Sequence, residues 1–73
     1  MAKLPLHKVK VDTSDYINVY GHRPSGIGYW GFSDKYDPDD NEIWWFNGLY
    51  SQCKNKAIHN AASRGSAKVY LQA

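Results

Sequence analysis

Histidine and cysteine are the side chains of this sequence best suited to metal binding or nucleophilic catalysis. The sequence contains His7, His22, His59 and a single cysteine, Cys53. No pair among them has the C-x₂-C or H-x₃₋₅-H spacing of a structural zinc site, and one thiolate is too few for such a site. Cys53 and His59 would lie on nearly opposite faces of a helix, so they cannot form a catalytic pair. We therefore predict no metal site and no catalytic residue, and we interpret Cys53 as a small buried apolar side chain.

Carboxylates gather in the segment DKYDPDDNE at residues 34–42, where a hard cation could bind. A calcium-binding EF-hand loop needs acidic side chains at alternate positions, a glycine at the turn and a glutamate at position 12. The segment lacks both the spacing and the glycine. We interpret it as a solvated acidic loop, whose charge would repel nucleic acid locally.

Glycines dominate residues 21–32, GHRPSGIGYWGF, and three of them have the G-x-G-x-x-G spacing of a dinucleotide-binding loop. That loop holds pyrophosphate at the N-terminus of a helix that follows it. Here the glycines lead into the aromatic run YWGF, which is typical of a strand. We predict a hairpin loop over residues 21–27 instead. His22 and Arg23 would lie at its exposed tip, where they could contact a partner.

The sequence is rich in aromatic residues, with three Trp, six Tyr and two Phe. Trp44 and Trp45 are neighbours in the segment EIWWF (42–46), so they must point to opposite faces of a strand. If Trp44 belongs to the core, Trp45 is exposed. Exposed Trp and Tyr side chains favour a protein interface, because these residue types dominate binding hot spots. Base stacking and simple surface packing are the alternatives.

A small set of elements must position these side chains. Alternating or apolar runs predict strands at residues 7–11, 16–20, 28–33, 42–46 and 67–71. Apolar residues between 49 and 61 recur at helical spacing, with Asn47 or Ser51 as N-cap and Gly65 just after the C-terminus. The order β-β-β-β-α-β predicts a two-layer α+β domain, in which one helix covers one face of a mostly antiparallel sheet of four to five strands. The strand at 42–46 is expected in the centre of the sheet, with a parallel connection through the helix to 67–71.

Length and charge set further limits. A chain of 73 residues with a net charge of +2 forms one small domain, expected at residues 7–73 after a flexible tail at residues 1–6. The single cysteine and the lack of a long apolar run favour the cytosol, with no secretory signal and no membrane span. Lys3, Lys8 and Lys10 make the N-terminal segment basic, and the middle of the chain is acidic. This distribution suits electrostatic docking to a charged macromolecule.

Three segments together resemble part of the ribonuclease H-like fold. They are VYGHRPSGIGYWGF, EIWWFNGLYSQCKNKAIHNAAS and AKVYL, which are similar to its β-hairpin, third strand, first helix and fourth strand. The family's metal-binding carboxylates are missing, because Gly21 stands nearest to the first Asp and Cys53 or Lys54 stands at the position of the helix Glu. The family's next Asp follows the fourth strand, and this sequence ends at Ala73. Two-metal hydrolysis requires these carboxylates, so the resemblance implies a similar layout without nuclease activity.

In length, charge layout and arrangement of strands and helix, the whole chain resembles the small proteins that lytic bacteriophages make to bind the host RNA polymerase. The resemblance implies a stoichiometric protein partner, no cofactor, inhibition of transcription initiation and, in some members, antitermination. We therefore expect a monomeric, non-enzymatic regulator in the host bacterial cytoplasm. Two alternatives stay open: a small protein that binds single-stranded nucleic acid, and an inhibitor of another host or defence enzyme. The residues that we expect to contact the partner are Lys3, Lys8, Lys10, His22 and Arg23, with Tyr29 and Trp45 as aromatic anchors.

Overall fold

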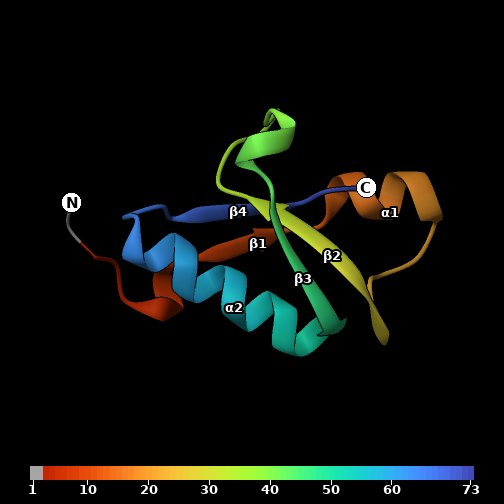
Figure 1. The fold of residues 1–73 in the computed structure, drawn as a ribbon, viewed down its shortest axis with the longest axis horizontal. Coiled ribbons are helices and arrows are strands. Elements are labelled where there is room, and N and C mark those ends of the chain that lie inside the picture. Colours follow the sequence, from red (N-terminus) through yellow and green to blue (C-terminus); the bar gives the residue numbers. More distant parts are fainter. Residues whose placement is uncertain (1–2) are drawn as a thin grey trace.

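Four strands and two α-helices make up the fold in a computed structural model that describes residues 3–73 (Figure 1). The α+β class, the mostly antiparallel sheet and a helix on one sheet face are confirmed. The order is β-α-β-β-α-β, however, with a second helix in place of one predicted strand. The elements are η1 (Leu6–Lys8, a 3-10 helix), β1 (Lys10–Asp12), α1 (Ser14–Tyr20), β2 (Ile27–Ser33), η2 (Asp40–Glu42, a 3-10 helix), β3 (Trp44–Leu49), α2 (Tyr50–Ser63) and β4 (Lys68–Leu71).

The strands lie in the order β1-β4-β2-β3. β1 and β4 pair in parallel, whereas β2 pairs antiparallel with both β3 and β4. β3 and β4 therefore run in the same direction, as predicted for the connection through the helix. β3 is an edge strand, so the expected central position was wrong. Its side chains alternate between half-buried and exposed along the strand, which means that the apolar run IWWF does not indicate burial on both faces.

The strand predicted at residues 16–20 is the helix α1 (Ser14–Tyr20). The Asp12 carboxylate accepts a hydrogen bond from the Ser14 backbone N–H at 2.9 Å, which fixes the turn into the helix. Gly21 ends the helix in the left-handed conformation, with φ of +76°. Tyr16 and Tyr20 are four residues apart and their rings contact each other at 4.5 Å between centroids, as helical spacing allows. These local contacts outweigh the strand preference of YINVY.

Two other predicted strands begin two or more residues later than expected. β1 starts at Lys10 rather than at residue 7, because Pro5 leads into η1 and the N–H groups of Lys8 and Val9 bond to the carbonyls of Pro5 and Leu6. β3 starts at Trp44 and continues to Leu49, where α2 begins without a side-chain cap. Neither Asn47 nor Ser51 is therefore the N-cap. Leu4 donates a hydrogen bond to the Ala62 carbonyl, so residue 4 of the predicted tail contacts α2; residues 1 and 2 lie outside the described residues.

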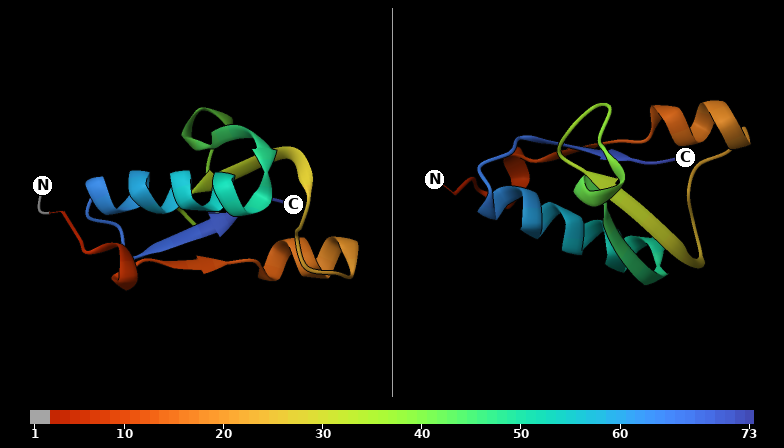
Figure 2. Two further views of the ribbon diagram at one scale, coloured as in Figure 1. Left: turned by 90° about the horizontal axis from the view of Figure 1, so that it is seen from below. Right: turned by 45° about the horizontal axis from the view of Figure 1, so that its top comes forward.

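The core lies between the sheet and α2, which covers one sheet face (Figure 2). The predicted helical stripe is confirmed by the burial of Cys53, Ala57 and Ala61 on α2. The helix ends as predicted at Gly65, whose φ is +73°. The N–H groups of Gly65 and Ser66 bond to the carbonyls of Ala62 and Ala61, the pattern of a Schellman motif. The buried apolar residues are Val9, Trp30, Phe32, Cys53, Ala57, Ala61, Ala62, Val69 and Leu71.

Candidate functional site

Tyr29 and Trp45 stack on each other on the exposed face of the sheet, away from the core. Their ring centroids are 5.0 Å apart and the ring planes differ by 9°. The Tyr29 side chain is 66% exposed and Trp45 is 48% exposed, although both are large and apolar. Their strand neighbours Trp30 and Phe46 pack on the opposite face with the core, as the alternation of a strand requires. The expectation that Trp44 and Trp45 point to opposite faces is confirmed, and it is Trp44 that contacts the core.

Gly31 lets the Trp45 ring lie flat against the sheet. Gly31 pairs with Trp45 across the β2–β3 ladder. A Cβ atom at Gly31 would lie 2.7 Å from Cζ3 of Trp45 and 3.0 Å from Cγ2 of Ile43, which is closer than carbon atoms pack. Because the glycine leaves this space free, the Trp45 ring can pack over the backbone of β2.

The pair borders a groove of about 500 Å³ that we call the aromatic groove. Tyr16 and Tyr20 line it from α1, and Ile27, which is 81% exposed, lines it from the start of β2. The sequence prediction missed both tyrosines because it placed them in a strand. No lysine or arginine among residues 3–73 lines this groove, whose polar side chains include Ser25 and Gln72.

His22, in the loop at residues 21–26, lies near the tyrosine rings of α1. Its ring lies 5.9 Å from the Tyr16 ring and 6.5 Å from the Tyr20 ring, and Nδ1 is 3.0 Å from the Arg23 carbonyl oxygen. The loop joins α1 to β2, so the predicted hairpin between two strands was wrong. His22 and Arg23 are nevertheless exposed. Pro24, which follows them in the loop, is buried.

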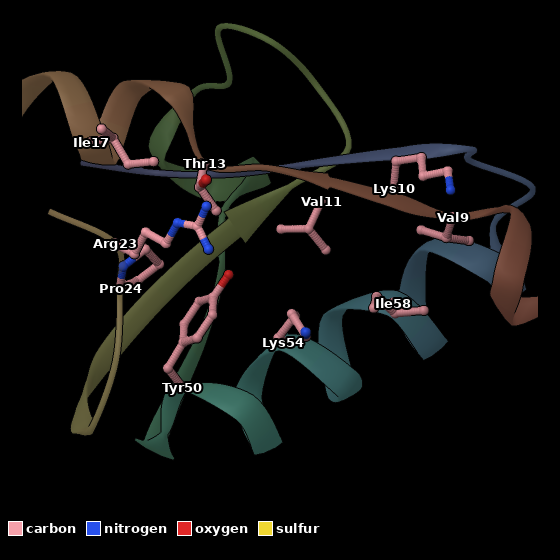
Figure 3. Close-up of a pocket in the computed structure, with 10 residues that line it drawn as sticks. All are labelled: Val9, Lys10, Val11, Thr13, Ile17, Arg23, Pro24, Tyr50, Lys54 and Ile58. Atoms are coloured by element: carbon pink, nitrogen blue, oxygen red, sulfur yellow. The ribbon is translucent and has the colours of Figure 1, made fainter.

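Arg23 lines a second hollow, of about 490 Å³, that we call the cationic pocket (Figure 3). Lys10 from β1 and Lys54 from α2 also line it. The Tyr50 N–H donates a hydrogen bond of 2.8 Å to the Gly26 carbonyl, which ties the loop to the start of α2. Arg23 and Lys54 thus line the same pocket, although they are far apart in the sequence. Lys54 was not among the site residues predicted from the sequence.

The remaining predicted contacts lie apart from both hollows. Lys3 and Lys8 are exposed near and within η1, and neither lines the aromatic groove or the cationic pocket. The predicted partner residues therefore do not form one patch. Lys10 and Arg23 share the cationic pocket, Tyr29 and Trp45 border the aromatic groove, and His22 contacts the tyrosines of α1.

The acidic loop is held by ion pairs within the fold. Lys35 pairs with Glu42, and the Asp34 carboxylate accepts hydrogen bonds from Ser66 Oγ at 2.7 Å and from Arg64 Nε at 3.0 Å. Burial opposes ionisation of Asp34, but these hydrogen bonds outweigh it and lower the pKa of Asp34. Within the described part of the chain, no three His, Cys, Asp or Glu side chains are grouped as metal ligands.

Comparison with known proteins gives no relative: the chain matches no protein-family model, no curated protein and no solved structure. Within residues 3–73, no helix is long and apolar enough to cross a membrane.

Proposed function

We propose that this protein is a non-enzymatic binding module that docks onto a protein partner with its aromatic groove. The observation that carries the proposal is the exposed, parallel stack of Tyr29 and Trp45 on a rigid pair of strands. Rigid aromatic side chains lose little conformational entropy on binding, and Trp and Tyr are the residue types most enriched in hot spots. The Trp45 ring packs over Gly31, whose missing side chain leaves room for it, and such packing favours a preorganised contact surface.

The charges around the groove favour protein over single-stranded nucleic acid. Surfaces that bind single strands combine stacking platforms with cations that follow the phosphate backbone. Among the described residues, neither lysine nor arginine lines the aromatic groove. The two rings also stack on each other, so a base would have to separate them or use only the outside of the pair. A partner that offers apolar side chains and neutral hydrogen-bonding groups meets neither obstacle.

The partner that we propose is the host bacterial RNA polymerase, bound by a bacteriophage protein that inhibits initiation or acts in antitermination. The support for this partner is the resemblance of the chain in length and charge layout. Exposed Lys3, Lys8 and Lys10 would attract an acidic surface and speed the encounter, and the aromatic groove would supply the lasting contact. An inhibitor of another bacterial enzyme would use the same surface, so the partner must be identified by experiment.

The test uses the full-length protein and purified bacterial RNA polymerase holoenzyme in a surface-based binding assay, with nuclease-treated components. We expect saturable binding, and we expect Tyr29→Ala or Trp45→Ala to weaken it about 30-fold or more, as loss of a hot spot does. Tyr36→Ala is the matched control, because Tyr36 is 71% exposed but packs against Tyr70 outside the groove.

The outcomes separate the partner from the surface. Absence of binding to polymerase would refute the polymerase proposal. Recovery of a different protein from lysate, lost with Trp45→Ala but not with Tyr36→Ala, would replace the partner and retain the surface. Equal losses for Tyr36→Ala and Trp45→Ala would refute the aromatic groove as the contact surface.

A further inference from the structure

The cationic pocket gathers positive charge that the fold itself does not neutralise. Arg23, Lys10 and Lys54 line it, and the residues described there include no carboxylate. Within residues 3–73 none of these three cations forms an ion pair; the ion pairs of that range join Lys35 with Glu42, Arg64 with Asp34, and Lys68 with Asp12. Lys3, Lys8 and Lys56 form no ion pair in this range either, but they do not line the pocket. What distinguishes Arg23, Lys10 and Lys54 is that all three line one hollow without a carboxylate among its lining residues.

Neutral hydrogen-bond donors accompany the cations. Tyr50 and Thr13 both line the pocket, and Figure 3 shows the Tyr50 hydroxyl and the Arg23 guanidinium directed toward each other from α2 and from the loop. Burial raises the pKa of Tyr50 still further above neutral pH, and the protonated phenol can donate a hydrogen bond. Lys54 stands one helical turn beyond Tyr50 on the same helix, and Lys10 lies at the opposite end of the pocket from Arg23.

The other walls of the pocket are apolar. Val11 and Ile58 face the space from β1 and α2, and Ile17 and Pro24 close the side of α1 and the loop. A volume of about 490 Å³ falls within the range of sites that hold small organic ligands. A bare ion would leave these apolar walls in contact with water, whereas a ligand with both an anionic group and an apolar or aromatic body would cover them.

We infer that the cationic pocket binds an organic phosphate, with the phosphoryl group between Arg23 and Lys54 and the organic body against Val11 and Ile58. Arginine presents a planar pair of donors that matches phosphate oxygens, and lysine adds a compact positive charge. A doubly charged phosphate monoester uses two cations and a phenol donor more fully than a single carboxylate does. The pocket shares no lining residue with the aromatic groove, so this inference does not depend on the proposed protein partner.

The test is a titration of the full-length, isotope-labelled protein followed by amide chemical shifts. The first probe is inorganic phosphate, with sodium chloride at equal ionic strength as reference. The second pair of probes is adenosine 5′-monophosphate and adenosine. We expect saturable shifts at Thr13, Arg23, Tyr50 and Lys54 with both phosphates, tighter binding of the nucleotide than of inorganic phosphate, and no saturation with adenosine.

Three variants make the titration specific. Arg23→Gln and Lys54→Gln should each weaken nucleotide binding about tenfold or more, because each removes a charge-assisted hydrogen bond. Lys56→Gln is the matched control, since it removes the same charge from α2 at an exposed position that does not line the pocket, and it should change the affinity less than about twofold. The same spectra report whether each variant is folded.

Several results would overturn the inference. Shifts with phosphate that match those with chloride would refute a phosphate site, and equal weakening by Lys56→Gln and Lys54→Gln would reduce the effect to general surface charge. A nucleotide that binds no more tightly than inorganic phosphate would refute the role of the apolar walls. A last pair of probes, an oligonucleotide with a 5′-phosphate and the same oligonucleotide with a 5′-hydroxyl, identifies the source of the phosphate. If the phosphorylated oligonucleotide binds more tightly than the nucleotide and the hydroxyl form does not, the site binds nucleic-acid ends. If the nucleotide binds more tightly, the site binds free nucleotides.

Discussion

Replacing Gly31 with alanine should remove the flat support of the aromatic pair. The new Cβ atom would lie 2.7 Å from one atom of the Trp45 ring and 2.9 Å from another, so the ring must move outward. The displacement costs the overpacking energy of an added methyl group, about 1–3 kcal/mol. It also weakens the stack with Tyr29, which is worth about 0.5–1.5 kcal/mol. We expect a net loss of about 2 kcal/mol in the free energy of unfolding, or a Tm lower by roughly 8–16 °C for a domain of this size.

A double-mutant cycle shows whether Trp45 causes this loss. In a Trp45→Ala background the methyl group meets only Cγ2 of Ile43, at 3.0 Å, which is the end of a side chain that can shift. Alanine is also preferred over glycine inside a strand by about 0.5–1 kcal/mol. Gly31→Ala should therefore be close to neutral or slightly stabilising in that background, with a coupling energy of at least about 1 kcal/mol between the two positions. The measurement is denaturant unfolding followed by far-ultraviolet circular dichroism.

Gly28→Ala is the matched control on the same strand. Its Cβ atom would lie 3.2 Å from the Trp30 ring on the other sheet face, a contact that a small shift relieves. It should cost less than Gly31→Ala, and its cost should not depend on Trp45. If Gly31→Ala destabilises the protein equally with and without Trp45, the glycine does not act by supporting the tryptophan, and the account of a preorganised aromatic pair fails.

The remaining predictions concern charged side chains and the glycine that ends α2. The pKa of Asp34 is lower in the folded protein than its unfolded value of 3.8. Its contribution to stability is therefore complete above pH 3.8 and is lost as the pH falls through the lower folded pKa. Asp34→Asn should cost about 1 kcal/mol at pH 7 and make the stability depend less on pH in this acidic range. The triple variant Lys8→Glu, Lys10→Glu and Arg23→Glu should slow association with the partner in stopped-flow measurements at low salt, and the difference should shrink at high salt. An unchanged rate would rule out steering by these cations. Gly65→Ala should lower the free energy of unfolding by about 1–2 kcal/mol in the same denaturant assay, because φ of +73° is unfavourable for alanine; no change would mean that the helix end can rearrange.

The helix α2 could be predicted from the sequence, whereas α1 could not by the same reasoning. In α2 the apolar residues recur over several turns, and Gly65 ends the helix just after Arg64, so the pattern and the stop signal agree. α1 has seven residues, too few to establish a helical period against the strand preference of YINVY. The start signal at Asp12 and the stop signal at Gly21 were both present in the sequence. Asp and Gly are also common in turns, however, so the same residues can equally flank a strand.

The candidate site likewise has one feature that the sequence predicts and one that it does not. The exposure of Trp45 follows from strand alternation next to Trp44, so one local rule predicted it. The cationic pocket needs β1, the loop at 21–26 and α2 to meet, and no local rule places Arg23 and Lys54 in the same pocket. The hydrogen bond between the Tyr50 N–H and the Gly26 carbonyl, 24 positions apart, is one of the contacts that join the loop to α2. Long-range contacts of this kind are set by tertiary packing, which sequence patterns do not specify.

The two hollows also determine which variants are informative. His22 and Arg23 are adjacent in the loop, yet His22 contacts the tyrosines of α1 while Arg23 lines the cationic pocket. A change in this loop can therefore disturb both surfaces, and its effect on binding has two possible causes. Trp45 and Lys54 lie on separate elements and each lines one hollow. Trp45→Ala should abolish protein binding and leave phosphate binding intact, and Lys54→Gln should do the opposite. Such a result would require two independent binding surfaces on this small domain.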